Sequence, residues 1–180
     1  MKSMKGVKGA KGIQDMDDRW REKVRTAEEL RGIVAKARSE GKVVVFTNGC
    51  FDLLHGGHIS YLEESRALGD LLILGLNSDS SIRQLKGPGR PVYPQDERLE
   101  ILAALEAVDY IVVFEDRSCD RLLAQIHPDI HSKGTDYTAD TVPERETARR
   151  LGIRTVIAGA PKENSTRDII ELVVEKNARR

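Results

Sequence analysis

The fold of this chain is decided at residues 43–58, which read VVVFTNGCFDLLHGGH. Residues 43–46 form an unbroken apolar run, which is typical of a parallel strand covered on both faces. Residues 59–68 have the periodicity of a helix, and Gly69 supplies its stop. The intervening segment, which ends in HGGH, is therefore expected at the carboxyl end of a strand, where ligands gather in parallel sheets.

Strand-like and helix-like segments alternate along the rest of the chain. Further strands are predicted at 71–76, 110–114, 129–132 and 154–158, and further helices at 98–108, 119–126, 144–151 and 166–177. A capping box that starts at Thr26 and a stop at Gly41 predict a leading helix. Because crossovers between parallel strands are right-handed, this alternation predicts an α/β fold: a Rossmann-like, doubly wound parallel five-stranded sheet with helices on both faces.

The size of the chain suits a single domain. It has 180 residues, and 39% of them are hydrophobic, which is enough for one buried core. We assign residues 25–180 to this domain and residues 1–24, which start with a Lys/Gly-rich run, to a flexible tail. Such a basic run also suits an arm that touches nucleic acid, but solvated disorder is the commoner state.

Charge and cysteine content narrow the class of protein. Lys plus Arg and Asp plus Glu both number 29, so no overall field recruits nucleic acid or an acidic membrane. The two cysteines, Cys50 and Cys119, are too few for a disulfide framework. No apolar run is long enough for a membrane span or a secretory signal. These features predict a cytoplasmic protein without nucleic-acid or membrane partners.

The HGGH segment has the properties of a phosphate site. A helix amino terminus presents unpaired N–H groups, and Gly56 and Gly57 remove side chains that would hold a phosphate at a distance. His55 and His58 are three residues apart, so both imidazoles project to the same side once helical geometry begins. The chain has neither G-x-x-x-x-G-K-[ST] nor G-x-G-x-x-G after this strand, which disfavours kinases, GTPases and dehydrogenases.

The segments GCFD and HGGH together resemble the HxGH signature of the cytidylyltransferase-like nucleotidyltransferases. Further segments extend the similarity to most of the chain from residue 43 onward, and together they resemble a heptose 1-phosphate adenylyltransferase. These segments are Gly69-Asp70, Leu76-Asn77-Ser78-Asp79, Leu85-Lys86-Gly87, Arg90-Pro91-Val92, Arg98, Ala103-Ala104-Leu105, Val108-Asp109 and Lys133-Gly134-Thr135-Asp136-Tyr137. The heptose enzymes usually have glycine where this chain has Thr135, which leaves the subfamily and the base preference open.

The resemblance implies a role for each matching residue. It implies catalytic, phosphate-stabilising roles for His55, His58, Lys86 and Arg98. It implies nucleotide contacts from Thr47, Asn48, Gly49, Cys50, Phe51, Gly57, Lys133, Gly134, Asp136, Asn164, Ser165 and Thr166. It implies substrate contacts from Asp52, Asn77, Asp79 and Arg90.

Several of these residues also fit ordinary structural roles. Lys86 opens a Gly/Pro-rich loop whose mobility would let the ammonium close over a triphosphate, but a solvated loop lysine has the same surroundings in sequence. Arg98 opens a helix, where the guanidinium either grips phosphate with two hydrogen bonds or pairs with Glu97 or Glu100. Simple structural roles also fit Ser165 as an N-cap, Asp136 as a loop acid and Cys50 as a packing residue.

No metal site made by the protein is predicted. His127 and His131 suit turn and strand positions, because no group of cysteines or acids in the sequence completes a tetrahedral set around them. His55 and His58 likewise lack a third ligand nearby. Mg²⁺ is expected as the companion of ATP, bound mainly by triphosphate oxygens and water.

The resemblance implies transfer of AMP from ATP to a sugar 1-phosphate, specifically a heptose 1-phosphate used for lipopolysaccharide or other surface glycans. The sugar phosphate attacks the α-phosphorus in line and pyrophosphate leaves, so the protein aligns two anions and needs no covalent intermediate. Cytidylyl transfer to glycerol 3-phosphate is one alternative, and a non-catalytic nucleotide-binding module is another. The resemblance also implies a homodimer and a separate sugar kinase that supplies the acceptor.

Overall fold

The computed structural model describes residues 19–160 and 166–178. It contains five parallel strands, β1 (Val44–Gly49), β2 (Leu71–Asn77), β3 (Tyr110–Phe114), β4 (Ile130–Gly134) and β5 (Arg154–Ala158). They form one sheet in the order β3-β2-β1-β4-β5. The order changes direction between β1 and β4, and the crevice outside the carboxyl ends of such neighbouring strands is where doubly wound sheets bind ligands. The predicted α/β, Rossmann-like fold is confirmed.

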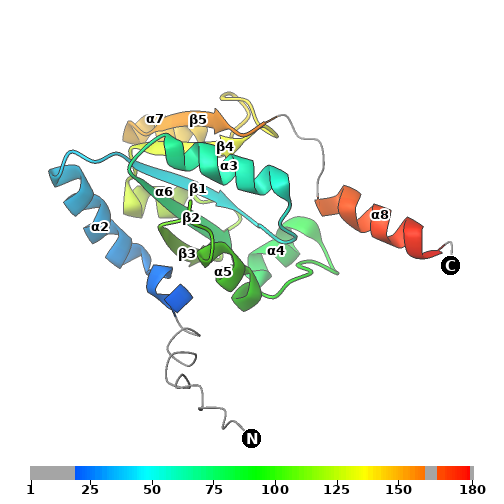
Figure 1. Ribbon diagram of the computed structural model, residues 1–180. Coiled ribbons are helices and arrows are strands. Elements are labelled where there is room, and N and C mark those ends of the chain that lie inside the picture. The colour runs from blue at the N-terminus through cyan, green and yellow to red at the C-terminus, as the bar shows by residue number, and fades with distance from the viewer. Residues whose placement is uncertain (1–18, 161–165, 179–180) are drawn as a thin grey trace, which may run out of the picture.

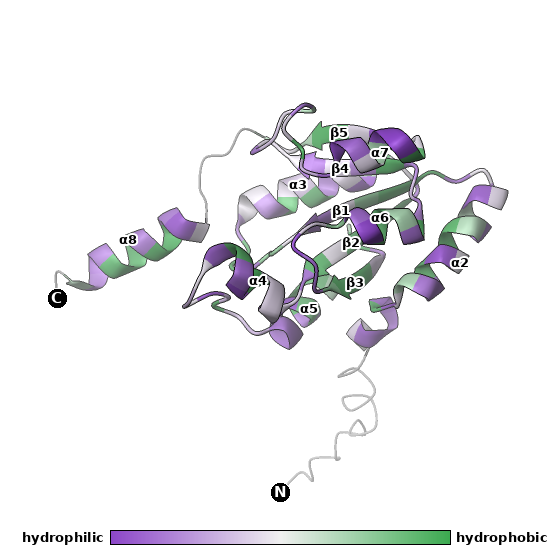
Figure 2. Ribbon diagram, turned by 180° about the vertical axis from the view of Figure 1, so that it is seen from behind, coloured by the Kyte–Doolittle hydropathy of each residue, from purple (hydrophilic) through white to green (hydrophobic). Residues whose placement is uncertain are grey.

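The helices cover both faces of this sheet. In chain order they are η1 (Arg19–Lys23, a 3₁₀ helix), α2 (Ala27–Ser39), α3 (Gly56–Ala67), α4 (Asp79–Lys86), α5 (Gln95–Ala103), α6 (Asp120–Ile126), α7 (Arg145–Leu151) and α8 (Thr166–Ala178). Helices α3 and α5 lie over one face (Figure 1), and α2, α6 and α7 over the other (Figure 2). Because neighbouring strand residues point to opposite faces, Val45 packs in the first layer and Phe46 in the second.

Two helices differ from the sequence prediction. Helix α4 was not predicted, and Lys86 ends this helix instead of opening a loop. Its sequence, DSSIRQLK, buries only Ser81 and Ile82, so apolar periodicity gives little signal. The Ser78 hydroxyl, which accepts a hydrogen bond from the Ser81 amide, is the remaining cue. Helix α5 spans 95–103 instead of 98–108.

The expectation of a flexible tail up to residue 24 is wrong for its last part. Helix η1 occupies 19–23, and Val24 forms a β-bridge with Ile111. Trp20 and Val24 pack against the core beneath α5, and Lys23 Nζ donates to the Leu105 carbonyl at 2.9 Å. The ordered part of the chain therefore includes Arg19–Lys23. Residues 1–18 lie outside the described residues.

Helix α8 lies apart from the sheet (Figure 1) and has no buried residue. Leu172, Val173 and Val174 are exposed on it. No helix within the described ranges has both the length and the apolar character of a membrane span.

Candidate active site

The segment after β1 bends back at Phe51. This residue has a φ of 44°, a left-handed conformation that bulky side chains rarely adopt and that occurs at functional sites. The Phe51 ring lies over Gly49, where an added Cβ would come within 2.9 Å of a ring carbon. The same ring lies 5.4 Å from the ring of His58, measured between centroids. Glycine at position 49 therefore permits the bend that leads the chain into α3.

The two histidines of HGGH lie side by side at the start of α3. His55 is the N-cap of the helix, and its ring centroid is 4.0 Å from that of His58, which confirms the expected geometry. A Cβ at Gly57 would lie 3.1 Å from the His55 ring, so a side chain there would displace the imidazole. The His55 side chain makes no capping hydrogen bond to α3, and the first turn of the helix holds no acid. The positive end of the helix dipole is thus available to an anion.

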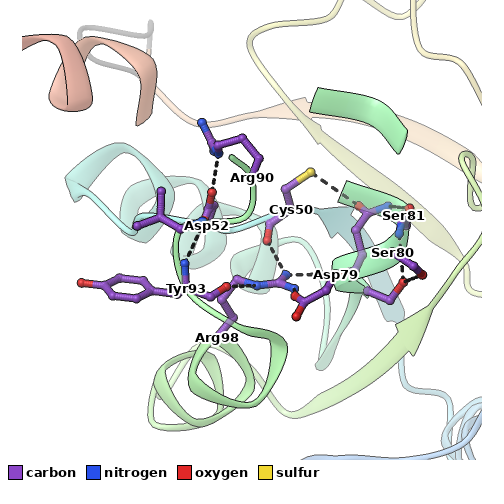
Figure 3. A network of polar contacts seen from close by, with 11 residues as sticks. Cys50, Asp52, Asp79, Ser80, Ser81, Arg90, Tyr93 and Arg98 are labelled. Atoms are coloured by element: carbon purple, nitrogen blue, oxygen red, sulfur yellow. Dashed lines mark hydrogen bonds and ion pairs between the residues drawn. The ribbon is translucent and has the colours of Figure 1, made fainter. Parts of the chain in front are cut away.

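The Asp52 carboxylate holds the loop that precedes α5 (Figure 3). One of its oxygens accepts from Arg90 Nε at 2.6 Å, and the other accepts from the backbone amides of Val92 and Tyr93 at 2.8 and 3.0 Å. The carboxylate is only 1% exposed. Asp52 and Arg90 were predicted to touch substrate. In this structure Asp52 instead anchors the loop, and Arg90 remains partly exposed beside it.

Arg98 is buried inside the site instead of facing the crevice (Figure 3). Its guanidinium donates to the carbonyls of Tyr93, Cys50 and Asn77 and to the Asp79 carboxylate, the last at 2.7 Å. The side chain is 0% exposed. Neither alternative from the sequence, a phosphate grip or a pair with a neighbouring glutamate, describes these bonds. Arg98 therefore joins the ends of β1 and β2 to α5.

Positive charge gathers around Cys50. Burial raises the pKa of its thiol, and so does the Asp52 carboxylate, whereas the cations of Lys86, Arg98 and Arg90 act in the opposite direction. The Lys86 side chain is exposed. A protonated, half-buried thiol is a poor nucleophile, in line with the packing role expected for Cys50. Of these cations, Lys86 is exposed and Arg90 partly exposed, and such groups suit a triphosphate.

The carboxyl end of β4 adds a second group beside β1. Lys133 Nζ lies 3.1 Å from Asn48 Oδ1, 3.6 Å from the Glu144 carboxylate and 4.9 Å from the Tyr137 ring centroid. Lys133 is 6% exposed, so it is held mainly by protein groups. Asp136 follows in the loop after β4 and is exposed. The carboxyl ends of β1 and β4 thus lie side by side where the strand order changes direction, the place at which this fold class binds ligands.

Other predicted residues lie elsewhere. Thr47 is 0% exposed and its hydroxyl pairs with that of Tyr61, so the prediction that Thr47 contacts nucleotide is not supported by its position. Asn77 donates from its amide to the Ser81 hydroxyl and is also buried. Thr166 Oγ1 donates to the Leu53 carbonyl at 3.4 Å, so the start of α8 reaches the loop before HGGH. Asn164 and Ser165 lie outside the described residues.

Three buried residues near this site were not predicted to meet. His131 is 0% exposed, and burial together with the nearby Lys133 charge lowers its pKa to about 3, so the imidazole is neutral. Cys119 and Glu144 lie beside it. No sequence pattern predicts this meeting, because the residues lie on three separate elements and each alone suits a structural position.

Comparison with known proteins agrees with this geometry. Residues 46–176 match the family described as cytidylyltransferase-like. A solved structure, the lipopolysaccharide core biosynthesis protein from Thermoplasma volcanium, superposes with a TM-score of 0.58 at 28% identity, over 68% of this chain and 100% of that chain. The protein belongs to the cytidylyltransferase-like family.

Among the proteins similar in sequence to this chain are bacterial proteins named bifunctional protein HldE. The protein of Syntrophotalea carbinolica is 49% identical over 154 residues, which are 86% of this chain and 31% of the relative. That of Geobacter sulfurreducens is 48% identical over 153 residues, with 85% and 31% coverage. The chain thus spans about a third of the length of the curated relatives that it matches.

Proposed function

We propose that this protein transfers AMP from ATP to a sugar 1-phosphate, with heptose 1-phosphate as the acceptor, and releases pyrophosphate. The observation that carries the proposal is the pair of imidazoles at the amino terminus of α3, at the point where the strand order changes direction. Sequence identity of 49% to a protein named bifunctional protein HldE supports the choice of reaction. Structural similarity to a lipopolysaccharide core biosynthesis protein supports the choice of acceptor.

The geometry supports separate roles for the residues that would surround the triphosphate. His55, His58 and the first amides of α3 would donate to phosphate oxygens, where negative charge grows as pyrophosphate leaves. Lys86 at the end of α4 and Arg90 in the segment that follows would add positive charge. A phosphate monoester is already nucleophilic, so alignment and charge stabilisation account for catalysis without a general base.

Mg²⁺ fits this site as a companion of the nucleotide. The carboxylates of Asp52 and Asp79 are already bonded to arginines, so the ion would be bound mainly by phosphate oxygens and water. It would neutralise charge on the leaving group. We further propose that the protein works in the cytoplasm as a homodimer and receives its acceptor from a sugar kinase.

A matrix of nucleotides and acceptors tests the proposal. Pyrophosphate release is measured with ATP or CTP, each combined with heptose 1-phosphate, other sugar 1-phosphates or glycerol 3-phosphate. We expect the highest kcat/KM with ATP and heptose 1-phosphate. A preference for CTP with glycerol 3-phosphate would assign the alternative transferase activity. Saturable nucleotide binding without turnover of any acceptor would identify a binding module.

A further inference from the structure

Three buried side chains that are typical metal ligands meet between β4 and the helices α6 and α7. Cys119 is the N-cap of α6, His131 lies on β4, and Glu144 is the N-cap of α7. Their Sγ, imidazole nitrogen and carboxylate oxygen all lie within 4.8 Å of one another. The three residues are 0%, 0% and 3% exposed. We call them the Cys-His-Glu cluster.

Hydrogen bonding fixes the tautomer of His131. Asn48 Oδ1 receives the Lys133 ammonium, which only donates, so the atom that faces this pocket is the oxygen. The same oxygen lies 3.0 Å from His131 Nε2. Because an amide oxygen only accepts, Nε2 carries the proton, and Nδ1 keeps its lone pair. Within the described part of the chain, that Nδ1 has no hydrogen-bond partner.

The Glu144 carboxylate is also incompletely bonded. Its Oε1 accepts a long bond, 3.4 Å, from the Cys119 amide, and its Oε2 has no hydrogen-bond partner among the described residues. Lys133 Nζ is 3.6 Å from Oε2, which supplies charge but is too far for a good hydrogen bond. A buried lone pair without a partner lowers the stability of the fold. The cluster thus contains two buried acceptor atoms that lack donors.

We propose that Cys119, His131 and Glu144 bind a transition-metal ion of the zinc class. Thiolate, imidazole and carboxylate form a donor set that Zn²⁺ favours, and the ion would occupy both unsatisfied acceptors. Asn48 acts as the outer partner that orients the imidazole, as is usual for histidine ligands. Tetrahedral ligands lie about 3.5 Å apart at zinc bond lengths, so small side-chain movements close the site.

Binding of the metal ion would release one proton from the protein. The Cys119 thiol loses its proton to solvent when the sulfur bonds to the metal, and Glu144 and the neutral imidazole bind without losing one. Three protein ligands leave one tetrahedral position for water. The ion would tie the starts of α6 and α7 to β4, directly behind Asn48 and Lys133. The proposal of a metal site does not rest on the proposed transfer reaction.

Cobalt substitution tests the proposal on the whole chain without an affinity tag. Metal-stripped protein is titrated with Co²⁺ and then with Zn²⁺, and absorption, released protons and thermal unfolding are recorded. We expect one ion per chain, a thiolate-to-cobalt charge-transfer band that Zn²⁺ abolishes, and a higher Tm with Zn²⁺. Cys119→Ser should remove the band, and Glu144→Gln should weaken Zn²⁺ binding by about tenfold or more.

Cys50→Ser is the matched control. The chain has two cysteines, so this variant leaves Cys119 as the only thiol and should keep the band. If the variants of the Cys-His-Glu cluster fail to fold, the band in Cys50→Ser still shows whether the Cys119 thiol binds the metal. Absence of the band in the wild-type chain overturns the proposal. So does a band that is lost in Cys50→Ser, or Zn²⁺ affinity that is equal in the wild type and in a folded Glu144→Gln variant.

Discussion

The residues of this site fall into two groups that differ in burial. Some are partly exposed and can meet a ligand, and others are buried and hold the neighbouring segments in place. His55 and His58 are partly exposed at the start of α3, whereas Arg98 is enclosed by protein acceptors. An exposed donor can meet an anion, but a buried guanidinium whose nitrogens are already bonded would have to leave its partners to do so. The two kinds of residue should respond differently to substitution.

Replacement His58→Ala should lower kcat roughly 100- to 1000-fold, the usual cost of removing one donor from a charge-stabilising site. The free energy of unfolding should change little, because the side chain lies at the edge of the crevice. Pyrophosphate release and urea unfolding measure the two effects. His127→Asn is the control, because His127 is exposed and has a left-handed backbone conformation. Asparagine tolerates that conformation. Near-normal turnover in folded His58→Ala would remove His58 from the mechanism.

Replacement Arg98→Lys should instead lower the free energy of unfolding, by about 3 kcal/mol, because a lysine cannot reproduce the fork of hydrogen bonds and leaves buried acceptors unpaired. Urea unfolding measures the loss. Arg83→Lys, at an exposed position of α4, should be neutral. A fully stable Arg98→Lys variant with low kcat would argue for direct phosphate contact instead.

At the scale of elements, side chains join segments that are distant in sequence. Asp52 links the loop after β1 to the segment before α5, and Tyr61 on α3 bonds to Thr47 on β1 and to the Ser132 carbonyl on β4. These links hold the two borders of the crevice in fixed positions. Each can be weakened separately.

The Asp52 link predicts loop dynamics. Asp52→Asn removes the charge and leaves one acceptor oxygen where two oxygens now accept three bonds. Charged hydrogen bonds contribute about 1.5–3 kcal/mol, so the Val92 and Tyr93 amides should exchange at least about tenfold faster. Hydrogen exchange resolved by residue tests this. Asp96→Asn, an exposed acid in α5, should leave both rates unchanged, and equal rates in Asp52→Asn would contradict the anchor.

The Tyr61 link predicts a pH dependence. Burial raises the pKa of Tyr61 from 10.0 to about 12. Between these values the unfolded chain loses the phenol proton while the folded chain keeps it, so stability falls as the pH rises from 10 to 12, by about 2–3 kcal/mol from this group. Urea unfolding across that range should show a steeper fall for the wild type than for Tyr61→Phe. Tyr93→Phe, an exposed tyrosine, should keep the wild-type slope.

At the scale of the whole molecule, the domain is larger than the sequence indicated. A chain that starts at Arg25 lacks Trp20 and Val24, whose apolar surface packs under α5. It should be about 2 kcal/mol less stable to urea than a chain that starts at Arg19, from the lost burial. Trp20→Ala in the longer chain should reproduce most of the loss. Equal midpoints for both chains would show that η1 adds nothing to the domain.

The strand and helix alternation and the position of HGGH were predictable because both are local properties. Apolar runs of strand length, capping residues and glycine stops depend on neighbours in sequence, and the carboxyl end of a parallel strand is a defined place in this fold class. Helix α4 was less predictable, because a helix this short carries too little apolar periodicity. The start of the domain was also less predictable, because η1 places only a few apolar residues within a polar segment.

What the sequence by itself determined is therefore the α/β class and the HGGH segment at the end of β1, in front of α3. The tertiary structure alone decided that Arg98 is enclosed, that Asp52 anchors a loop, and that Cys119, His131 and Glu144 meet. The physical reason is that burial and contact between distant segments arise from packing. The pattern of one segment contains no information on which side chains of another will surround it.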